Sequence, residues 1–103
     1  MNGITVYKGD SKSLTIEIPA TTSLSGYTSI LVVSDKEISG TTIFTATGTT
    51  ISGELSQQQT TFTITKDNNE IEPRVYFYQV YIISGEEKIT ITSDTYCVLP
   101  SIT

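Results

Sequence analysis

Short runs in which apolar and polar residues alternate recur along the chain, separated by residues typical of turns. The pattern is clearest at 14–18, where leucine or isoleucine alternates with threonine and glutamate. A period of two places apolar side chains on one face of a β-strand. No stretch keeps a 3.6-residue period over the length of a helix. The pattern predicts strands at 4–7, 14–18, 27–34, 41–47, 60–66, 74–84, 88–92 and 96–99, with a weaker candidate at 49–55.

Turn residues separate these runs. Pro19 has no N–H to donate and ends the second strand. Asn and Asp at 67–69 tolerate left-handed backbone angles, so a solvated hairpin turn is expected there. Short strands at regular spacing, with no repeat or linker, indicate one domain over residues 1–103. The prediction is an all-β fold, an immunoglobulin-like antiparallel β-sandwich of about seven to eight strands.

The longest predicted strand, 74–84, is apolar on both faces. One face carries Tyr76, Tyr78, Val80 and Ile82, which we assign to the core or its edge. The other face carries Val75, Phe77, Tyr81 and Ile83, interrupted only by Gln79. A sandwich strand with one face in water should be polar on that face. The second apolar face therefore needs an explanation.

The strand at 27–34 has the same property. Ile30 and Val32 occupy one face and Leu31 and Val33 the other, and we assign Leu31 and Val33 to the outside. In an immunoglobulin-like sandwich these two strands are neighbours, so their outer faces would form one apolar patch. A patch above a few hundred Å² usually marks a protein partner. The predicted interface is Leu31, Val33, Val75, Phe77, Tyr81 and Ile83, and the alternative is that residues 34–40 or the tail cover it.

Tyr76 has a second expected role. A tyrosine near the start of such a strand commonly ties its hydroxyl back to the backbone at a corner of a sandwich. The preceding Glu72-Pro73-Arg74-Val75 sequence suits that role. Cys97 has parity opposite to its two neighbours, so we expect it near the outer face as a small apolar filler rather than a reactive thiol.

Charge and composition limit the classes of partner that the chain is expected to bind. The net charge of −5 and the pI near 4.4 disfavour nucleic acid. The longest aliphatic run, residues 30–33, is far too short to span a bilayer, so no membrane partner is expected. The start at Met1 lacks the pattern of a signal peptide, and a single cysteine fits synthesis in a reducing cytoplasm.

Candidate chemistry is weak. The chain has no histidine, which excludes Ser-His and Cys-His nucleophile pairs. The paired glutamates at 70/72 and 86/87 fall in turns, where their carboxylates are solvated. A catalytic acid and base need burial to separate their pKa values, and a solvated turn does not provide it. Residues 67–70 lack the spacing and central glycine of a calcium loop. We therefore expect neither catalysis nor a metal or other cofactor.

Several short motifs together resemble a known family. Lys8-Gly9-Asp10-Ser11 precedes the alternating strand, Leu24-Ser25-Gly26-Tyr27 opens the next, and Pro73 precedes Tyr76-Phe77-Tyr78-Gln79-Val80-Tyr81-Ile82. Gly85 then leads into Ile89-Thr90-Ile91-Thr92 and Tyr96-Cys97-Val98. The chain resembles the immunoglobulin-like N-terminal domain of phage baseplate upper proteins and related small virion modules. It departs from that family at Arg74 and at Asp94 or Thr95, where glycine is usual.

The resemblance implies a non-enzymatic structural or docking module of a phage virion. Its place would be the baseplate, tail, fibre attachment or capsid decoration, after synthesis in the bacterial host cytoplasm. Its partners would be other virion proteins or further copies of itself. The alternative is a glycan- or host-surface-binding module that uses exposed tyrosines and residues 67–74. A bacterial adhesin repeat is a weaker third reading.

Overall fold

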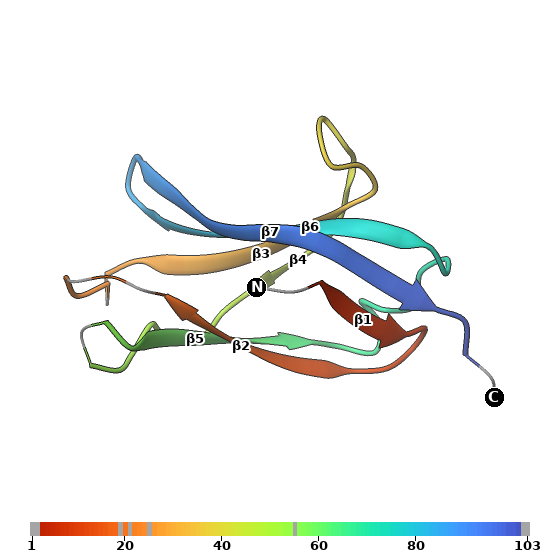
Figure 1. Cartoon of the computed structure of the whole chain (residues 1–103), viewed down its shortest axis with the longest axis horizontal. Helices are drawn as coiled ribbons and strands as arrows, with labels where there is room; N and C mark the ends of the chain where they lie inside the picture. The colour runs from red at the N-terminus through yellow and green to blue at the C-terminus, as the bar shows by residue number, and fades with distance from the viewer. Residues whose placement is uncertain (1–2, 19, 21, 25, 55, 102–103) are drawn as a thin grey trace.

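The computed structural model describes residues 3–101 except 19, 21, 25 and 55. These residues form seven β-strands and no helix, so the all-β prediction is confirmed (Figure 1). The strands are β1 (Ile4–Tyr7), β2 (Lys12–Ile18), β3 (Thr28–Ser34), β4 (Thr42–Thr47), β5 (Gln58–Ile64), β6 (Val75–Ser84) and β7 (Glu87–Leu99). In the weak candidate at 49–55, residues 49–54 form no strand, only an isolated bridge between Ser52 and Gln59. Pro19, predicted to end the second strand, lies outside the described residues.

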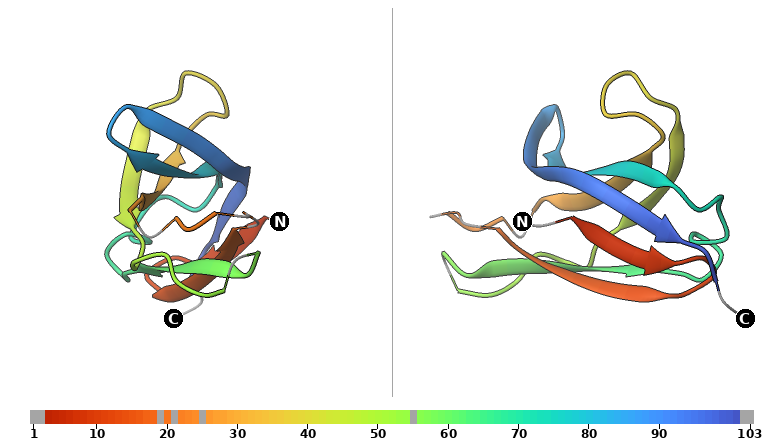
Figure 2. Two further views of the ribbon diagram at one scale, coloured as in Figure 1. Left: turned by 90° about the vertical axis from the view of Figure 1, so that its left-hand side faces the viewer. Right: turned by 45° about the vertical axis from the view of Figure 1, so that its right-hand side comes forward.

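The strands divide unequally between two sheets. The larger sheet has the order β1-β7-β6-β3-β4, and the smaller sheet pairs β2 with β5. The larger sheet is mixed, because β1 runs parallel to β7 while its other pairs are antiparallel. The prediction of a wholly antiparallel fold is therefore wrong for this pair. Figure 2 shows it curving over the smaller sheet. The predicted neighbours β3 and β6 do pair, with Ile30 opposite Tyr81 and Val32 opposite Gln79.

The connection at residues 65–74 differs from its prediction. It leads from β5 in the smaller sheet to β6 in the larger one, so it crosses between layers and is not a hairpin. The hairpin in this region is the next connection, where Ser84 pairs with Glu87 and Gly85 has a φ of 59°. That hairpin falls between the strands predicted at 74–84 and 88–92, where Gly85 and Glu86 form the turn.

The two strands predicted at 88–92 and 96–99 are one continuous strand, β7. The polar residues 93–95 suggested an interruption, yet they pair with Gln79, Tyr78 and Phe77 of β6. The register shifts at Val80/Tyr81, where Thr92 pairs with Val80 and Thr90 with Tyr81. The extra residue in the bulge is Ile91, whose half-buried side chain packs against both hydrophobic clusters of the core.

The core lies between the two sheets. The inward set predicted for β6 is confirmed, since Tyr76, Tyr78, Val80 and Ile82 are all buried. Leu31 and Val33 are also part of the core, with none of their surface exposed. The prediction that these two residues face outward is therefore wrong. The register explains the error: Leu31 pairs with Val80 and Val33 with Tyr78, so they share the inner face with those residues.

Two buried polar residues, Tyr76 and Asn69, make hydrogen bonds that fix the corners next to β6. The Tyr76 hydroxyl donates to the Glu72 carbonyl oxygen at 2.7 Å, which confirms the predicted corner. Asn69 is fully buried, contrary to the expected solvated turn. Its amide donates to the Asp10 carbonyl oxygen, and its side-chain oxygen accepts from the Tyr96 hydroxyl. The crossing segment is thus tied to both the β1–β2 turn and β7.

Candidate docking surface

The outer face of the larger sheet carries an apolar strip along its two central strands. We define the apolar strip as Ile30 and Val32 of β3 with Val75, Phe77, Tyr81 and Ile83 of β6. The strip is flanked by hydroxyl side chains, because Thr45 and Thr47 lie opposite β3 and Thr90 and Thr95 lie opposite β6. An apolar centre between polar margins is the usual layout of a protein interface.

Four of the six residues predicted for the interface lie on this strip. Val75 is 47% exposed, and Phe77, Tyr81 and Ile83 are half-buried. Leu31 and Val33 are in the core, and their places on the outer face are taken by Ile30 and Val32, both half-buried. The sequence could not distinguish the two pairs, because four consecutive aliphatic residues contain no alternation.

The strip is only partly shielded by its neighbours. The Lys88 ammonium lies over the Tyr81 ring, 4.4 Å from its centroid, a cation–π contact that also covers part of the ring. Cys97 pairs with Val75 and is half-buried, as expected for a residue near the outer face. Phe77 and Tyr81 stay partly exposed beside these contacts, so the strip remains available to a partner.

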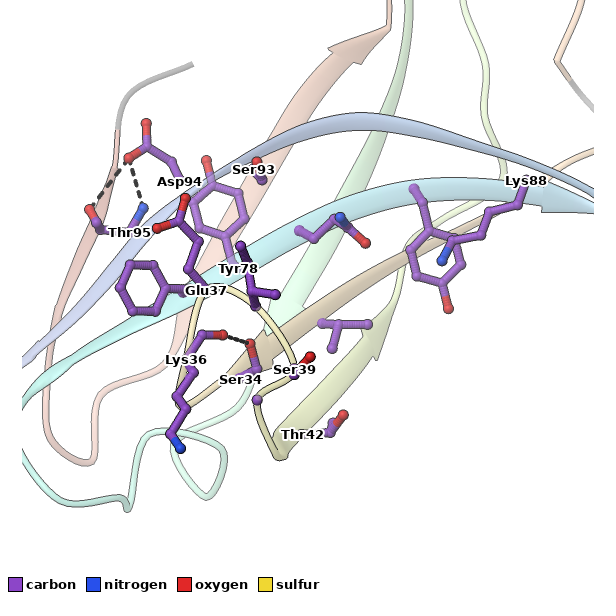
Figure 3. Close-up of a pocket in the computed structure, with 16 residues that line it drawn as sticks. Ser34, Lys36, Glu37, Ser39, Thr42, Tyr78, Lys88, Ser93, Asp94 and Thr95 are labelled. Carbon is purple, nitrogen blue, oxygen red and sulfur yellow. Dashed lines mark hydrogen bonds between the residues drawn. The ribbon is translucent and has the colours of Figure 1, made fainter.

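The loop between β3 and β4, residues 35–41, stands beside the strip and forms one wall of a groove of about 750 Å³ (Figure 3). Val32, Phe77, Gln79 and Tyr81 contribute to its lining from the sheet, and Lys88 and Asp94 contribute from β7. This loop therefore does not cover the strip, as the alternative prediction would require, because Phe77 and Tyr81 line an open groove.

The loop is held in place by hydrogen bonds. The Asp35 side chain accepts from the Thr41 N–H at 2.6 Å, and the Asp35 N–H donates to the Thr41 carbonyl oxygen at 3.1 Å. The Arg74 guanidinium, from the start of β6, donates to the Asp35 carbonyl oxygen at 3.2 Å. Ile38 projects from this fixed loop with 80% of its surface exposed. Ile38 was not predicted as part of this surface, because its only signal in the sequence is one aliphatic residue within a polar loop.

The groove also contains charged and hydroxyl side chains. Its charged side chains are Lys36, Glu37, Lys88 and Asp94, interspersed with serine and threonine. Asp94 already accepts from the Thr95 N–H at 2.7 Å. Burial raises the pKa of the Tyr78 hydroxyl, and the nearby Asp94 charge raises it further. A neutral phenol in this position is a hydrogen-bonding group, not a base.

Part of the residue set predicted for the alternative glycan-binding role is buried. Within residues 67–74, Asn69 is buried and committed to internal hydrogen bonds, and Tyr76 beside it is also buried. No group of three or more His, Cys, Asp and Glu side chains that could hold a metal ion occurs among the described residues. The described residues also include no helix long and apolar enough to cross a membrane.

Comparison with models of known protein families finds no family that matches the chain, and comparison with curated proteins finds no significant match.

Proposed function

We propose that this chain is a non-enzymatic docking module of a phage virion, acting in a baseplate, tail, fibre attachment or capsid decoration. The observation that carries the docking role is the apolar strip with its adjoining groove on the outer face of the larger sheet. Burial of apolar area contributes about 25 cal/mol per Å², so a partner covering this face gains a large hydrophobic term before association costs. The virion assignment is supported by the family resemblance of the sequence.

We also propose that the fold is an immunoglobulin-like sandwich. The division into a larger sheet containing β3, β6 and β7 and a smaller sheet pairing β2 with β5 is compatible with that topology. The Tyr76 contact with Glu72 is the corner device that recurs in such sandwiches. A sandwich of this kind presents one sheet face without blocking it, which suits docking.

The virion assignment is tested on purified particles. If the chain is a virion component, mass spectrometry of particles purified from the phage that encodes it should detect it in fixed stoichiometry to the capsid protein. The gene should also lie among genes for capsid and tail proteins. Particles that lack the chain altogether would overturn the assignment.

The docking surface is tested by a matched pair of aspartates on opposite faces of the molecule. Phe77→Asp places a charge in the apolar strip, whereas Thr63→Asp places the same charge on the exposed face of β5. We expect Phe77→Asp to fold, as judged by circular dichroism, and to be lost from particles. Thr63→Asp should be incorporated normally. Normal incorporation of folded Phe77→Asp would exclude the strip as the docking surface.

The groove gives some support to the alternative glycan- or host-surface-binding role. It combines the aromatic rings of Phe77 and Tyr81 with hydroxyl and carboxylate side chains, and aromatic rings with nearby polar groups can hold a sugar. A saturable hit on a glycan array that disappears with Phe77→Asp would favour this role over protein docking.

A further inference from the structure

We propose that the partner of the apolar strip is a second copy of the same chain, packed face to face about a two-fold axis. This inference rests on the proposed docking function and names its partner. Three features of one face lead to it: a projecting apolar side chain, an apolar end without a wall, and opposite charges at the positions that the symmetry brings together.

The projecting side chain is Ile38. It is the most exposed of the large hydrophobic residues in the described part of the chain. Its loop is tied at both ends by the Asp35–Thr41 hydrogen bonds and at its base by Arg74. A loop already fixed in place loses little conformational entropy when it docks. Ile38 is thus a preorganised apolar contact that stays largely exposed in its own chain.

The apolar end without a wall is the opposite end of the same strip. The loop follows Ser34, which pairs with Phe77, so it stands at the Phe77 end of β6. At the other end Ile30 pairs with Tyr81, and Ile83 follows two residues later on β6. Ile30 and Ile83 are half-buried and lie outside the groove lining. This end has apolar area without a loop above it.

A two-fold axis between the sheets, perpendicular to the strands and near Gln79, joins these features. It sets the two β6 strands antiparallel, so that each loop lies over the end without a wall on the other copy. Ile38 of each copy then contacts Ile30 and Ile83 of the second copy. An axis along the strands would instead bring the two projecting loops to the same end and make them collide.

The charges agree with this orientation. Glu37 precedes Ile38 on the loop, and Lys88 lies beside the wall-free end, opposite Ile83 and over the Tyr81 ring. The two-fold axis therefore brings Glu37 of each copy to Lys88 of the other. These local pairs offset the repulsion between two chains of charge −5, which physiological salt screens beyond about 8 Å.

The area required is available. A stable interface covers about 800 Å² on each partner, roughly an eighth of the 6220 Å² surface of this chain. The proposed interface draws this area from the outer face of the larger sheet together with the loop at 35–41. Because a two-fold contact is closed, the product is a dimer and not a filament.

Charge reversal tests the orientation by sedimentation equilibrium. Glu37→Lys and Lys88→Glu each place like charges together at both symmetric contacts, and we expect each to raise the dimer dissociation constant about tenfold or more. An equimolar mixture of the two variants should recover dimers, because opposite charges then meet at both contacts. Glu54→Lys makes the same change on an exposed loop residue away from this face and should leave dimerisation unchanged.

The outcomes separate this inference from the proposed function. A wild-type chain that stays monomeric up to roughly 1 mM overturns self-docking. The docking function survives that result if Phe77→Asp still prevents incorporation into particles, and it fails if Phe77→Asp is incorporated normally. Dimers that are insensitive to both folded charge variants, or that do not recover in the mixture, would overturn the proposed orientation.

Discussion

At the scale of single residues, the hydroxyl of Tyr76 joins the start of β6 to the crossing segment. We predict that Tyr76→Phe lowers the free energy of unfolding by about 1 kcal/mol, because it leaves the Glu72 carbonyl oxygen without its 2.7 Å donor. Urea denaturation measures the effect. Tyr81→Phe removes a hydroxyl from the outer face and should change stability by less than about 0.5 kcal/mol. Equal effects of the two changes would contradict a structural role for the corner.

The corner could be predicted because its residues are close in sequence, whereas the role of Asn69 could not. Locally, residues 67–70 have the composition of a solvated turn. The groups that satisfy the hydrogen bonds of the buried Asn69 amide are the Asp10 carbonyl and the Tyr96 hydroxyl, which lie 59 and 27 residues away in the sequence. A buried amide satisfied by such distant partners leaves no signal in its own neighbourhood.

At the scale of elements, alternation was informative only where it was present. β2 and β5 alternate, and the apolar residues of that alternation, such as Ile16 and Phe62, are buried. β3 has a continuous aliphatic run, and the pairing with β6 decided which face is buried. The apolar outer face was therefore predicted correctly as a property of two strands, while its β3 residues were misassigned by one position.

The passage from β4 to β5 gives a prediction about Gly48. Its N–H donates to the Ser29 carbonyl oxygen at 2.9 Å in the larger sheet, and the Thr49 N–H donates to Thr61 at 2.9 Å in the smaller one. A Cβ on Gly48 would collide with the hydroxyls of Ser29 and Thr60, which are hydrogen-bonded to each other. Gly48→Ala should therefore cost about 1–3 kcal/mol of stability.

Gly26→Ala is the matched control for that change. An added Cβ at Gly26 meets nothing within 4 Å, and its φ is not in the left-handed range. Stability should stay within about 0.5 kcal/mol of wild type. Thermal or urea unfolding compares the two variants. A Gly48→Ala chain as stable as Gly26→Ala would mean that the two sheets are not held at this crossing.

At the scale of the whole molecule, composition and pattern predicted an all-β domain but not how its strands divide. The parallel pairing of β1 with β7 brings Ile4 beside Tyr96, a contact across almost the entire chain. Pairings of that range depend on the assembled fold and not on local pattern. The role of Ile38 likewise depends on the folded structure, which places its loop beside the apolar strip. The surface could be predicted in outline, whereas its most distinctive contact could not.

The tyrosines buried in the core make the stability of the whole molecule depend on pH in the alkaline range. Burial raises the pKa of Tyr96 to about 12, and burial also raises the pKa values of Tyr76 and Tyr78 above 10. In the unfolded chain these phenols ionise near pH 10. Because their folded-state pKa values are raised, their contribution is fully present below pH 10 and is lost as the pH rises from 10 toward 12.

Urea unfolding at a series of pH values, with tyrosinate absorbance followed in parallel, measures this loss. We expect a constant unfolding free energy on the neutral side of pH 10 and a steep fall above it, with the last tyrosines ionising as the chain unfolds. Tyr96→Phe should lower stability at neutral pH and make the alkaline fall shallower, because one of the phenols that ionises only on unfolding is gone. Ionisation of every tyrosine near pH 10 in a chain that stays folded would show that the phenols are not sealed between the two sheets.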